Sequence, residues 1–293
     1  MNVRIIPRLD IKGSNLVKGI HLEGLRVLGS PENFARFYYE SGADELMYVD
    51  VVASLYNRNS LHDIISRTAR EIFIPLTVGG GLRTIEDIKG VLRAGADKVS
   101  LNTAAINNPE IIHQASRMFG SSTIVVAIEA IKQEDGSYLA YTDNGRQITG
   151  VDVSSWASQV EELGAGEILI TSVDREGTGL GFDVELTKKI TDAVSIPVIA
   201  HGGAGRQEHV VGVIRDANVN AVSIASMFHY DFIKIDTQER SPDKEGNVVF
   251  LNSGRGFSMV EATSVKELKK YLLTQQVKCR HEIENVSSKS DRA

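Results

Sequence analysis

The stretch "IPLTVGGG", residues Ile74 to Gly81, occurs again in altered form as "IPVIAHGGAG", residues Ile196 to Gly205. Each copy is a short apolar run that opens with Ile-Pro and closes on a glycine turn, a pattern typical of a buried strand that leads into a loop. Further pairs of segments repeat at the same offset of roughly 120 residues, which indicates a chain built from two similar halves.

The matching pairs extend along the whole repeat. "SLNTA" at Ser100 is matched by "SIASM" at Ser223, and "YVDVVAS" is matched by "LITSVDREG". Asp10 closes the first strand of one half and Glu129 closes the first strand of the other. We therefore expect two half-barrels of four strand–helix units each, with equivalent residues facing one another across one mouth.

Eight apolar runs rich in Val and Ile are typical of buried parallel strands, and segments with helical spacing, such as residues 30–42 and 84–95, lie between them. The predicted strands are "VRIIPRL", "ELMYVD", "IPLTV", "KVSL", "TIVVAIE", "EILITS", "IPVIA" and "AVSIA". This alternation predicts an α/β fold, a (β/α)8 TIM barrel. A doubly wound sheet would need a glycine fingerprint after its first strand, and "LDIKGSN" contains none.

The predicted barrel is a single domain that spans residues 1–280. A segment at about 231–263, between the eighth strand and the last helix, is predicted to be an inserted loop or hairpin lid at the catalytic face. The polar residues 281–293 are predicted to form a disordered tail.

Composition restricts the function. The 293 residues carry a formal charge of −6, which argues against a nucleic-acid partner. No apolar run is long enough for a membrane span, and residues 1–10 lack the apolar core of a signal peptide. The single cysteine, Cys279, makes neither an internal disulfide nor a zinc cluster, so we expect a cytoplasmic protein without metal or cofactor.

Two carboxylates stand at the C-terminal ends of predicted strands, where the active sites of such barrels lie. Asp10 and Glu129 occupy equivalent positions of the two halves. A single acid there could equally be a helix cap or a salt-bridge partner, but two facing acids favour general acid and general base catalysis.

The glycine turns predict anion sites, because glycine lets backbone N–H groups approach a ligand and a helix start follows each turn. The turn at Gly79–Gly81 is paired with Asn102 and Thr103, and the turn at Gly202–Gly205 with Ala225 and Ser226. Two such sites across the mouth would hold a ligand with a phosphate at each end.

These features together resemble the cyclase subunit of imidazole glycerol phosphate synthase, from about Val3 to His229 and again from Ser264 to Arg280. The motifs that carry the resemblance are "LDIKG", "LVKG", "DELMYVD", "TVGGG", "GADKVSLNTAA", "FGSSTIVVAIEA", "GAGEILITSVDREGT", "HGGAG" and "SMFHY". "ADKVSLNTAA" distinguishes the chain from the related sugar isomerase of the same pathway.

The resemblance implies an ammonia-using lyase of histidine biosynthesis. A glutaminase partner would supply ammonia through the barrel to a bisphosphorylated ribulosyl substrate, giving imidazole glycerol phosphate and an aminoimidazole carboxamide ribotide. Asp10 and Glu129 would be the catalytic pair. The implied substrate-binding residues are Lys18, Gly80, Gly81, Asn102, Thr103, Asp174, Glu176, Gly177, Gly203, Ala204, Ala225 and Ser226.

The resemblance also implies a charged ring at the N-terminal face of the barrel, where ammonia would enter and the glutaminase would dock. Its members would be Arg4, Glu45, Lys98 and Glu167. Such a ring is expensive unless every charge in it is paired, and a structural plug would fit the same residues.

Three mouth residues depart from the family pattern: Glu129 replaces an aspartate, Arg8 a small uncharged residue, and His201 a serine. The longer Glu129 moves its carboxylate by roughly 1 Å, enough to cost about a hundredfold in rate. Arg8 should share the inward face with Asp10 and could bridge to Glu129. An arginine close to either acid would hold that acid ionised, which works against a general acid and predicts weak turnover, improved by Arg8→Cys with Glu129→Asp.

Two other functions remain open from the sequence. The chain could be a paralogue that channels ammonia for amidino-sugar synthesis in surface polysaccharide assembly, which would explain the altered mouth. It could also be a non-catalytic scaffold that activates a glutaminase, although a scaffold would not need the glycine turns.

Overall fold

Eight parallel strands close into a barrel in the computed structural model, which describes residues 2–53, 61–235 and 259–280. The barrel strands are β1 (Arg4–Lys12), β4 (Leu46–Asp50), β5 (Leu76–Gly79), β6 (Lys98–Leu101), β7 (Ile124–Lys132), β10 (Glu167–Ser172), β11 (Val198–His201) and β12 (Ala221–Ile224). The β6–β7 and β1–β12 pairings join the two halves, and the β10–β7 pairing completes the circle of strands, so the predicted (β/α)8 barrel is confirmed.

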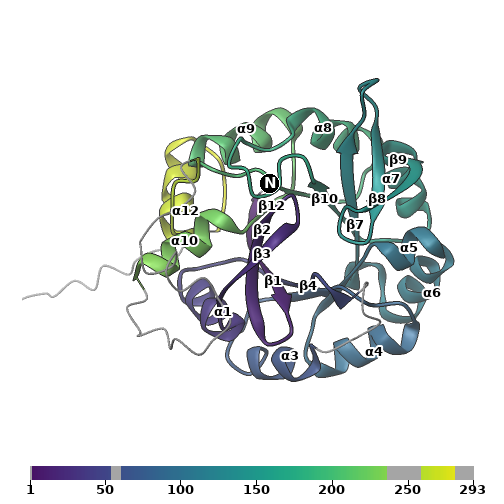
Figure 1. The fold of residues 1–293 in the computed structure, drawn as a ribbon, viewed down its shortest axis with the longest axis horizontal. Coiled ribbons are helices and arrows are strands. Elements are labelled where there is room, and N and C mark those ends of the chain that lie inside the picture. Colours follow the sequence, from purple (N-terminus) through teal and green to yellow (C-terminus); the bar gives the residue numbers. More distant parts are fainter. Residues whose placement is uncertain (1, 54–60, 236–258, 281–293) are drawn as a thin grey trace, which may run out of the picture.

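Helices form a ring around the strands (Figure 1). They are α1 (Pro31–Glu40), α3 (His62–Thr68), α4 (Ile85–Ala94), α5 (Thr103–Asn107), α6 (Glu110–Phe119), α7 (Val153–Glu162), α8 (Val184–Ala193), α9 (Gln207–Ala217), α10 (Ser226–Ile235) and α12 (Val265–Thr274), with a 3-10 turn at Ser121–Thr123. Their apolar stripes pack on the outer side of the strands to form the large core.

Local sequence explains where the helices begin and end. Thr84 caps α4 through a reciprocal capping box with Asp87, and Gly95 ends this helix in the left-handed conformation. Ser30 occupies the N-cap position of α1, but its hydroxyl donates to the Glu32 carboxylate at 2.6 Å instead of accepting from the backbone. The helix therefore relies on its proline at the first turn to start.

Each half of the barrel opens with the same construction, a long strand followed by an antiparallel hairpin. In the first half β1 pairs with β2 (Asn15–Ile20), which turns into β3 (Glu23–Gly29). In the second half β7 pairs with β8 (Tyr138–Thr142), which turns into β9 (Gln147–Asp152). Sequence analysis did not predict these hairpins. They strengthen the evidence for two related halves and extend the walls of the mouth.

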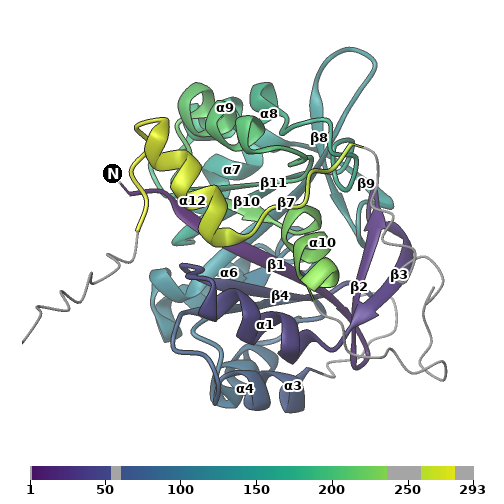
Figure 2. The same ribbon diagram turned by 90° about the vertical axis from the view of Figure 1, so that its left-hand side faces the viewer.

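The two ends of the barrel differ. Figure 2 shows the N-terminus at one end and the β2–β3 hairpin at the other. Residues that alternate inward along the strands therefore form layers from the N-terminal face to the mouth. Of the predicted inserted segment at 231–263, residues 236–258 lie outside the described residues. The predicted tail 281–293 lies outside them entirely.

Candidate functional site

The N-terminal end of the barrel interior is closed by four charged side chains in a cycle of alternating sign. Arg4 contacts Glu45 at 2.6 Å and Glu167 at 3.1 Å, and Lys98 contacts Glu45 at 3.2 Å and Glu167 at 2.8 Å. Every member of this charged ring thus faces two opposite charges, which offsets the desolvation that an unpaired charge would suffer. The structure places all four predicted residues together.

An apolar layer lies directly above the charged ring. Its buried members are Ile6, Met47, Val125, Leu169, Ile199 and Ala221, with Val49 and Ala127 packed against them. They come two positions after ring residues on several strands, as the alternation of side chains requires. A small neutral molecule such as ammonia would cross this layer at far lower cost than an ion or a sugar phosphate.

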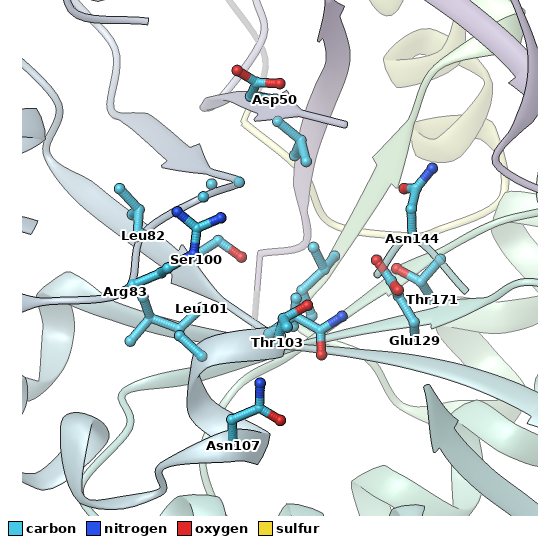
Figure 3. Close-up of a pocket in the computed structure, with 18 of the residues that line it drawn as sticks. Asp50, Leu82, Arg83, Ser100, Leu101, Thr103, Asn107, Glu129, Asn144 and Thr171 are labelled. Atoms are coloured by element: carbon cyan, nitrogen blue, oxygen red, sulfur yellow. The ribbon is translucent and has the colours of Figure 1, made fainter. Parts of the chain in front are cut away.

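A cavity of about 250 Å³ opens above the apolar layer at the mouth. Its lining residues are Arg8, Val49, Asp50, Gly79, Gly80, Gly81, Leu82, Arg83, Ser100, Leu101, Asn102, Thr103, Ala104, Asn107, Asn108, Ala127, Glu129, Asn144, Leu169 and Thr171. Glu129, Asn144 and Thr171 lie together on one side of it, and Leu82, Arg83 and Ser100 lie on the opposite side (Figure 3). The cavity therefore joins one predicted catalytic acid to one predicted phosphate loop.

Asp10 and Glu129 occupy equivalent places in the two halves. Asp10 pairs in register with Val17 of the first hairpin, and Glu129 with Tyr141 of the second. Glu129 lines the cavity, where its Oε2 accepts a 2.8 Å hydrogen bond from the Gly145 backbone N–H. The apolar strand β7 thus carries an acid at this position because the Glu129 side chain faces a cavity and not the core.

Arg8 is buried and forms an ion pair with Asp10, with Nε donating to Oδ1 at 2.8 Å. The two side chains stand two residues apart on β1 and so share its inward face, as predicted. The predicted bridge from Arg8 to Glu129 is wrong, because the same-strand neighbour is closer to the guanidinium and captures it. Glu129 instead accepts a hydrogen bond from the Gly145 N–H, and the Asn102 side chain also interacts with its carboxylate.

The two carboxyls consequently have opposite pKa shifts. Burial opposes ionisation of Asp10, but the charges of Arg8 and Lys18 outweigh it and hold the pKa of Asp10 below its ordinary value. Burial raises the pKa of Glu129 to about 7, with Arg8 and the Gly145 N–H opposing the rise only in part. Arg8 therefore holds Asp10 ionised, and it does not keep Glu129 ionised. One acid is charged and the other is poised near neutrality, the separation that acid–base catalysis requires.

The first glycine turn fits only glycine. A Cβ on Gly80 would lie 2.2 Å from the carbonyl oxygen of Asp50, and both Gly80 and Gly81 have φ values in the left-handed region, at 94° and 72°. Gly80, Gly81, Asn102 and Thr103 all line the cavity. The structure thus brings together all four residues of the first predicted phosphate site.

The second glycine turn has the same backbone constraint. Gly203 has a φ of 99°, and a Cβ there would lie 2.1 Å from the carbonyl oxygen of Gly181. Ala225 and Ser226 stand at the end of β12 and the start of α10, both buried. These second-half residues lie outside the lining of the 250 Å³ cavity, so the two predicted phosphate sites are separate places at the mouth.

Lys18 and Glu176 form a buried ion pair that joins the β2–β3 hairpin to the loop after β10. The other Glu176 carboxylate oxygen accepts from the Leu22 backbone N–H at 3.1 Å, and Gly177 packs against the Gly19 carbonyl, where a Cβ would come within 2.6 Å. Asp174 accepts from the Lys132 backbone N–H at 2.8 Å. These predicted substrate-binding residues are therefore engaged in holding the loops around the mouth.

His201 is buried at the end of β11, with Nδ1 2.9 Å from the Ser223 carbonyl oxygen. A carbonyl can only accept, so Nδ1 carries the proton and Nε2 presents a lone pair. Burial and the nearby Arg8 charge lower the pKa of His201 to about 3, which keeps the ring neutral. The family departure at this position thus introduces a neutral imidazole and adds no charge.

Sequence reasoning missed Asn144, Gly145 and Thr171, which line the cavity or hold Glu129. Asn144 and Gly145 form the turn of the β8–β9 hairpin, and the Asn144 amide also donates to the Leu22 carbonyl at 2.9 Å, so this turn reaches the first hairpin. The "DNG" tripeptide at 143–145 is a strong hairpin signal that would have revealed the turn.

Residues 2–53, 61–235 and 259–280 were the ranges in which two further features are absent. They contain no cluster of three or more His, Cys, Asp or Glu side chains arranged to hold a metal ion. Within the same ranges, no helix has the length and apolar character to cross a membrane.

Comparisons with known proteins match this geometry. The profile of the family described as histidine biosynthesis protein matches residues 4–234, a range that contains the charged ring, the apolar layer and the cavity. The imidazole glycerol phosphate synthase subunit HisF of Legionella pneumophila is 57% identical over 207 residues, which cover 71% of this chain and 98% of that protein.

Proposed function

This chain belongs to the histidine biosynthesis protein family, and on that premise we propose that it is the ammonia-using cyclase subunit of an imidazole glycerol phosphate synthase. It uses ammonia from a glutaminase subunit to close the imidazole ring of a bisphosphorylated ribulosyl substrate and to cleave it. The observation that carries the proposal is the pair of acids at equivalent strand ends, one ionised and one with a pKa of about 7.

Asp10 and Glu129 divide the proton chemistry between them. Glu129 lines the cavity and can hold a proton at neutral pH, so it serves as the general acid. Asp10 stays ionised beside Arg8 and Lys18. It can stabilise positive charge that develops on the substrate, or accept a proton from it. The replacement of aspartate by glutamate therefore retains the function of the position.

The two glycine turns position the substrate by its ends. Gly80–Gly81 with Asn102–Thr103 would hold one phosphate, and Gly203–Ala204 with Ala225–Ser226 would hold the other. The support is the left-handed backbone of Gly80, Gly81 and Gly203, which only glycine adopts without strain, because such a turn lets backbone N–H groups approach a ligand closely.

The glutaminase would dock at the N-terminal face of the barrel, over the charged ring. Ammonia would pass the ring, cross the apolar layer and reach the cavity from below. Support comes from the order of these three layers. The apolar layer admits a neutral molecule, and the closed ring has to open before ammonia can enter the barrel.

The direct test is turnover by the purified protein with ammonium salt and the ribulosyl bisphosphate substrate, followed by the release of the carboxamide ribotide. A rate of about 1 s⁻¹ or more is ordinary for an enzyme and is the expected result. Absence of turnover by a folded protein would remove the cyclase assignment. The comparisons do not favour the amidino-sugar or scaffold alternatives, and the same measurement distinguishes both from a cyclase.

A further inference from the structure

Arg8 combines deep burial with unused hydrogen-bond donors. Its side chain is 4% exposed, and its Nε donates to Asp10 at 2.8 Å. A guanidinium carries five N–H donors, and among the described residues Arg8 uses only this one. Because Arg8 also lines the cavity, its remaining donors are available to a molecule bound there.

The floor of the cavity is the top of the apolar layer. Leu169, Val49 and Ala127 belong to both, and Arg8 stands two residues above Ile6 of that layer on the inward face of β1. A ligand group held by Arg8 is therefore the first group that ammonia would meet on leaving the barrel interior. This inference rests on the proposed function.

The local charges favour a neutral oxygen as the partner of Arg8. The Arg8 charge is already balanced by Asp10, and the Lys18 charge by Glu176. A second anion beside Arg8 would repel the Asp10 carboxylate, whereas a carbonyl oxygen would accept from the open N–H groups without adding charge. Asn102 adds an unpartnered, buried Oδ1 that could accept from a substrate hydroxyl in the same cavity.

We propose that Arg8 is a catalytic residue that binds the carbonyl oxygen of the substrate carbon attacked by ammonia. The nitrogen lone pair forms the new C–N bond while the π pair of the C=O bond moves to oxygen, and the Arg8 N–H groups stabilise that negative charge. Glu129 delivers its proton to the oxygen and then takes one from the attached nitrogen. The product is a neutral carbinolamine, Glu129 is again protonated, and Asp10 remains ionised throughout.

The first measurement needs no turnover. Ribulose 5-phosphate is an open-chain ketone with one phosphate, so it can probe both the first glycine turn and Arg8. With ¹³C at its carbonyl, difference infrared spectra should show the carbonyl band of the bound ketone at lower wavenumber than in solution. In Arg8→Met the band should return toward the solution position, while Lys188→Met, which removes an exposed charge on α8, should match the wild type.

The second measurement is kinetic. Arg8→Met should lower kcat with ammonia about a hundredfold, the usual effect of removing one oxyanion donor. Arg8→Lys, which keeps a charge beside Asp10 but not the guanidinium fork, should recover part of the loss. It also serves as the test variant if Arg8→Met fails to fold.

Opposite results are easily recognised. Wild-type kcat in Arg8→Met, an unshifted carbonyl band in the wild type, or failure of the ketone to bind would each overturn the assignment of Arg8. A shifted, Arg8-dependent band in a wild-type protein without turnover would uphold the carbonyl site and remove the cyclase function, so the two proposals fail separately.

Discussion

Arg8 and Asp10, two residues apart on β1, form a buried 2.8 Å ion pair, and this contact leaves Glu129 as the only one of the two strand-end acids with a raised pKa. The arginine thus separates the two acids electrostatically. The sequence-based prediction that Arg8→Cys with Glu129→Asp improves turnover loses its premise, since Arg8 does not hold Glu129.

Glu129 should make the stability of the protein fall as pH rises. Its folded pKa of about 7 lies above its ordinary 4.5, so the folded state binds the extra proton and is favoured below 4.5. This contribution is lost as pH rises through about 7. Glu129→Gln should raise the melting temperature relative to wild type more at pH 8 than at pH 4.5. An equal difference at both pH values, or the same trend in the exposed control Glu134→Gln, would contradict the assignment.

Gly80→Ala should abolish anion binding at the first glycine turn. The added Cβ would lie 2.2 Å from the Asp50 carbonyl oxygen, on a backbone with a φ of 94°, at a cost of about 1–3 kcal/mol. Crystals soaked in phosphate should show anions at both turns in the wild type and only at Gly203 in the variant. Gly212→Ala on α9, where a Cβ meets nothing within 4 Å, is the control and should keep both anions. Absence of density at both wild-type turns would refute the bisphosphate site.

Gly145→Ala should lower kcat because Gly145 holds Glu129 through its N–H and has a φ of 76°. A shift of the carboxylate by about 1 Å would cost up to a hundredfold. Gly136→Ala is a closely matched control, since its φ of 84° creates similar backbone strain in the preceding turn without any contact to a new Cβ. Equal kcat losses in both variants would show that backbone strain, and not the position of Glu129, is responsible.

Lys98→Met should separate the two sources of ammonia. It opens the charged ring by removing the contacts to Glu45 and Glu167, far from the acids at the mouth. Turnover with ammonium salt should stay near wild type, while glutamine-dependent turnover with the glutaminase should fall about tenfold through lost coupling. Equal effects on both reactions, or on neither, would remove the ring from the ammonia route.

The barrel was predictable because its strands are short, apolar and repeated, which is the signal that burial on both faces produces. The first hairpin was not. In its turn, His21 and Leu22 have φ values of 52° and 61°. Glycine or asparagine at these positions would have predicted a turn, whereas histidine and leucine do not. Contacts from Glu176 to both residues hold this turn, and such contacts exist only after the halves have folded together.

The candidate acids and glycine turns were equally visible, because each stands at a strand end in both copies of the repeat. The partner of Arg8 and the pKa of Glu129 were not. Both depend on distances and burial inside the mouth. There Arg8 pairs with Asp10 of its own strand, and Glu129 accepts a hydrogen bond from the backbone N–H of Gly145, in a hairpin that the sequence did not predict.

The charged ring also has a consequence for how the chain folds. Arg4 and Glu167 are 163 residues apart and come from opposite halves, so their ion pair can form only when the barrel closes. An interaction made after the rate-limiting step slows unfolding and leaves the folding rate nearly unchanged. The charged ring therefore forms late and lengthens the lifetime of the closed barrel. Arg4→Met should accelerate unfolding in denaturant, while refolding proceeds at the wild-type rate.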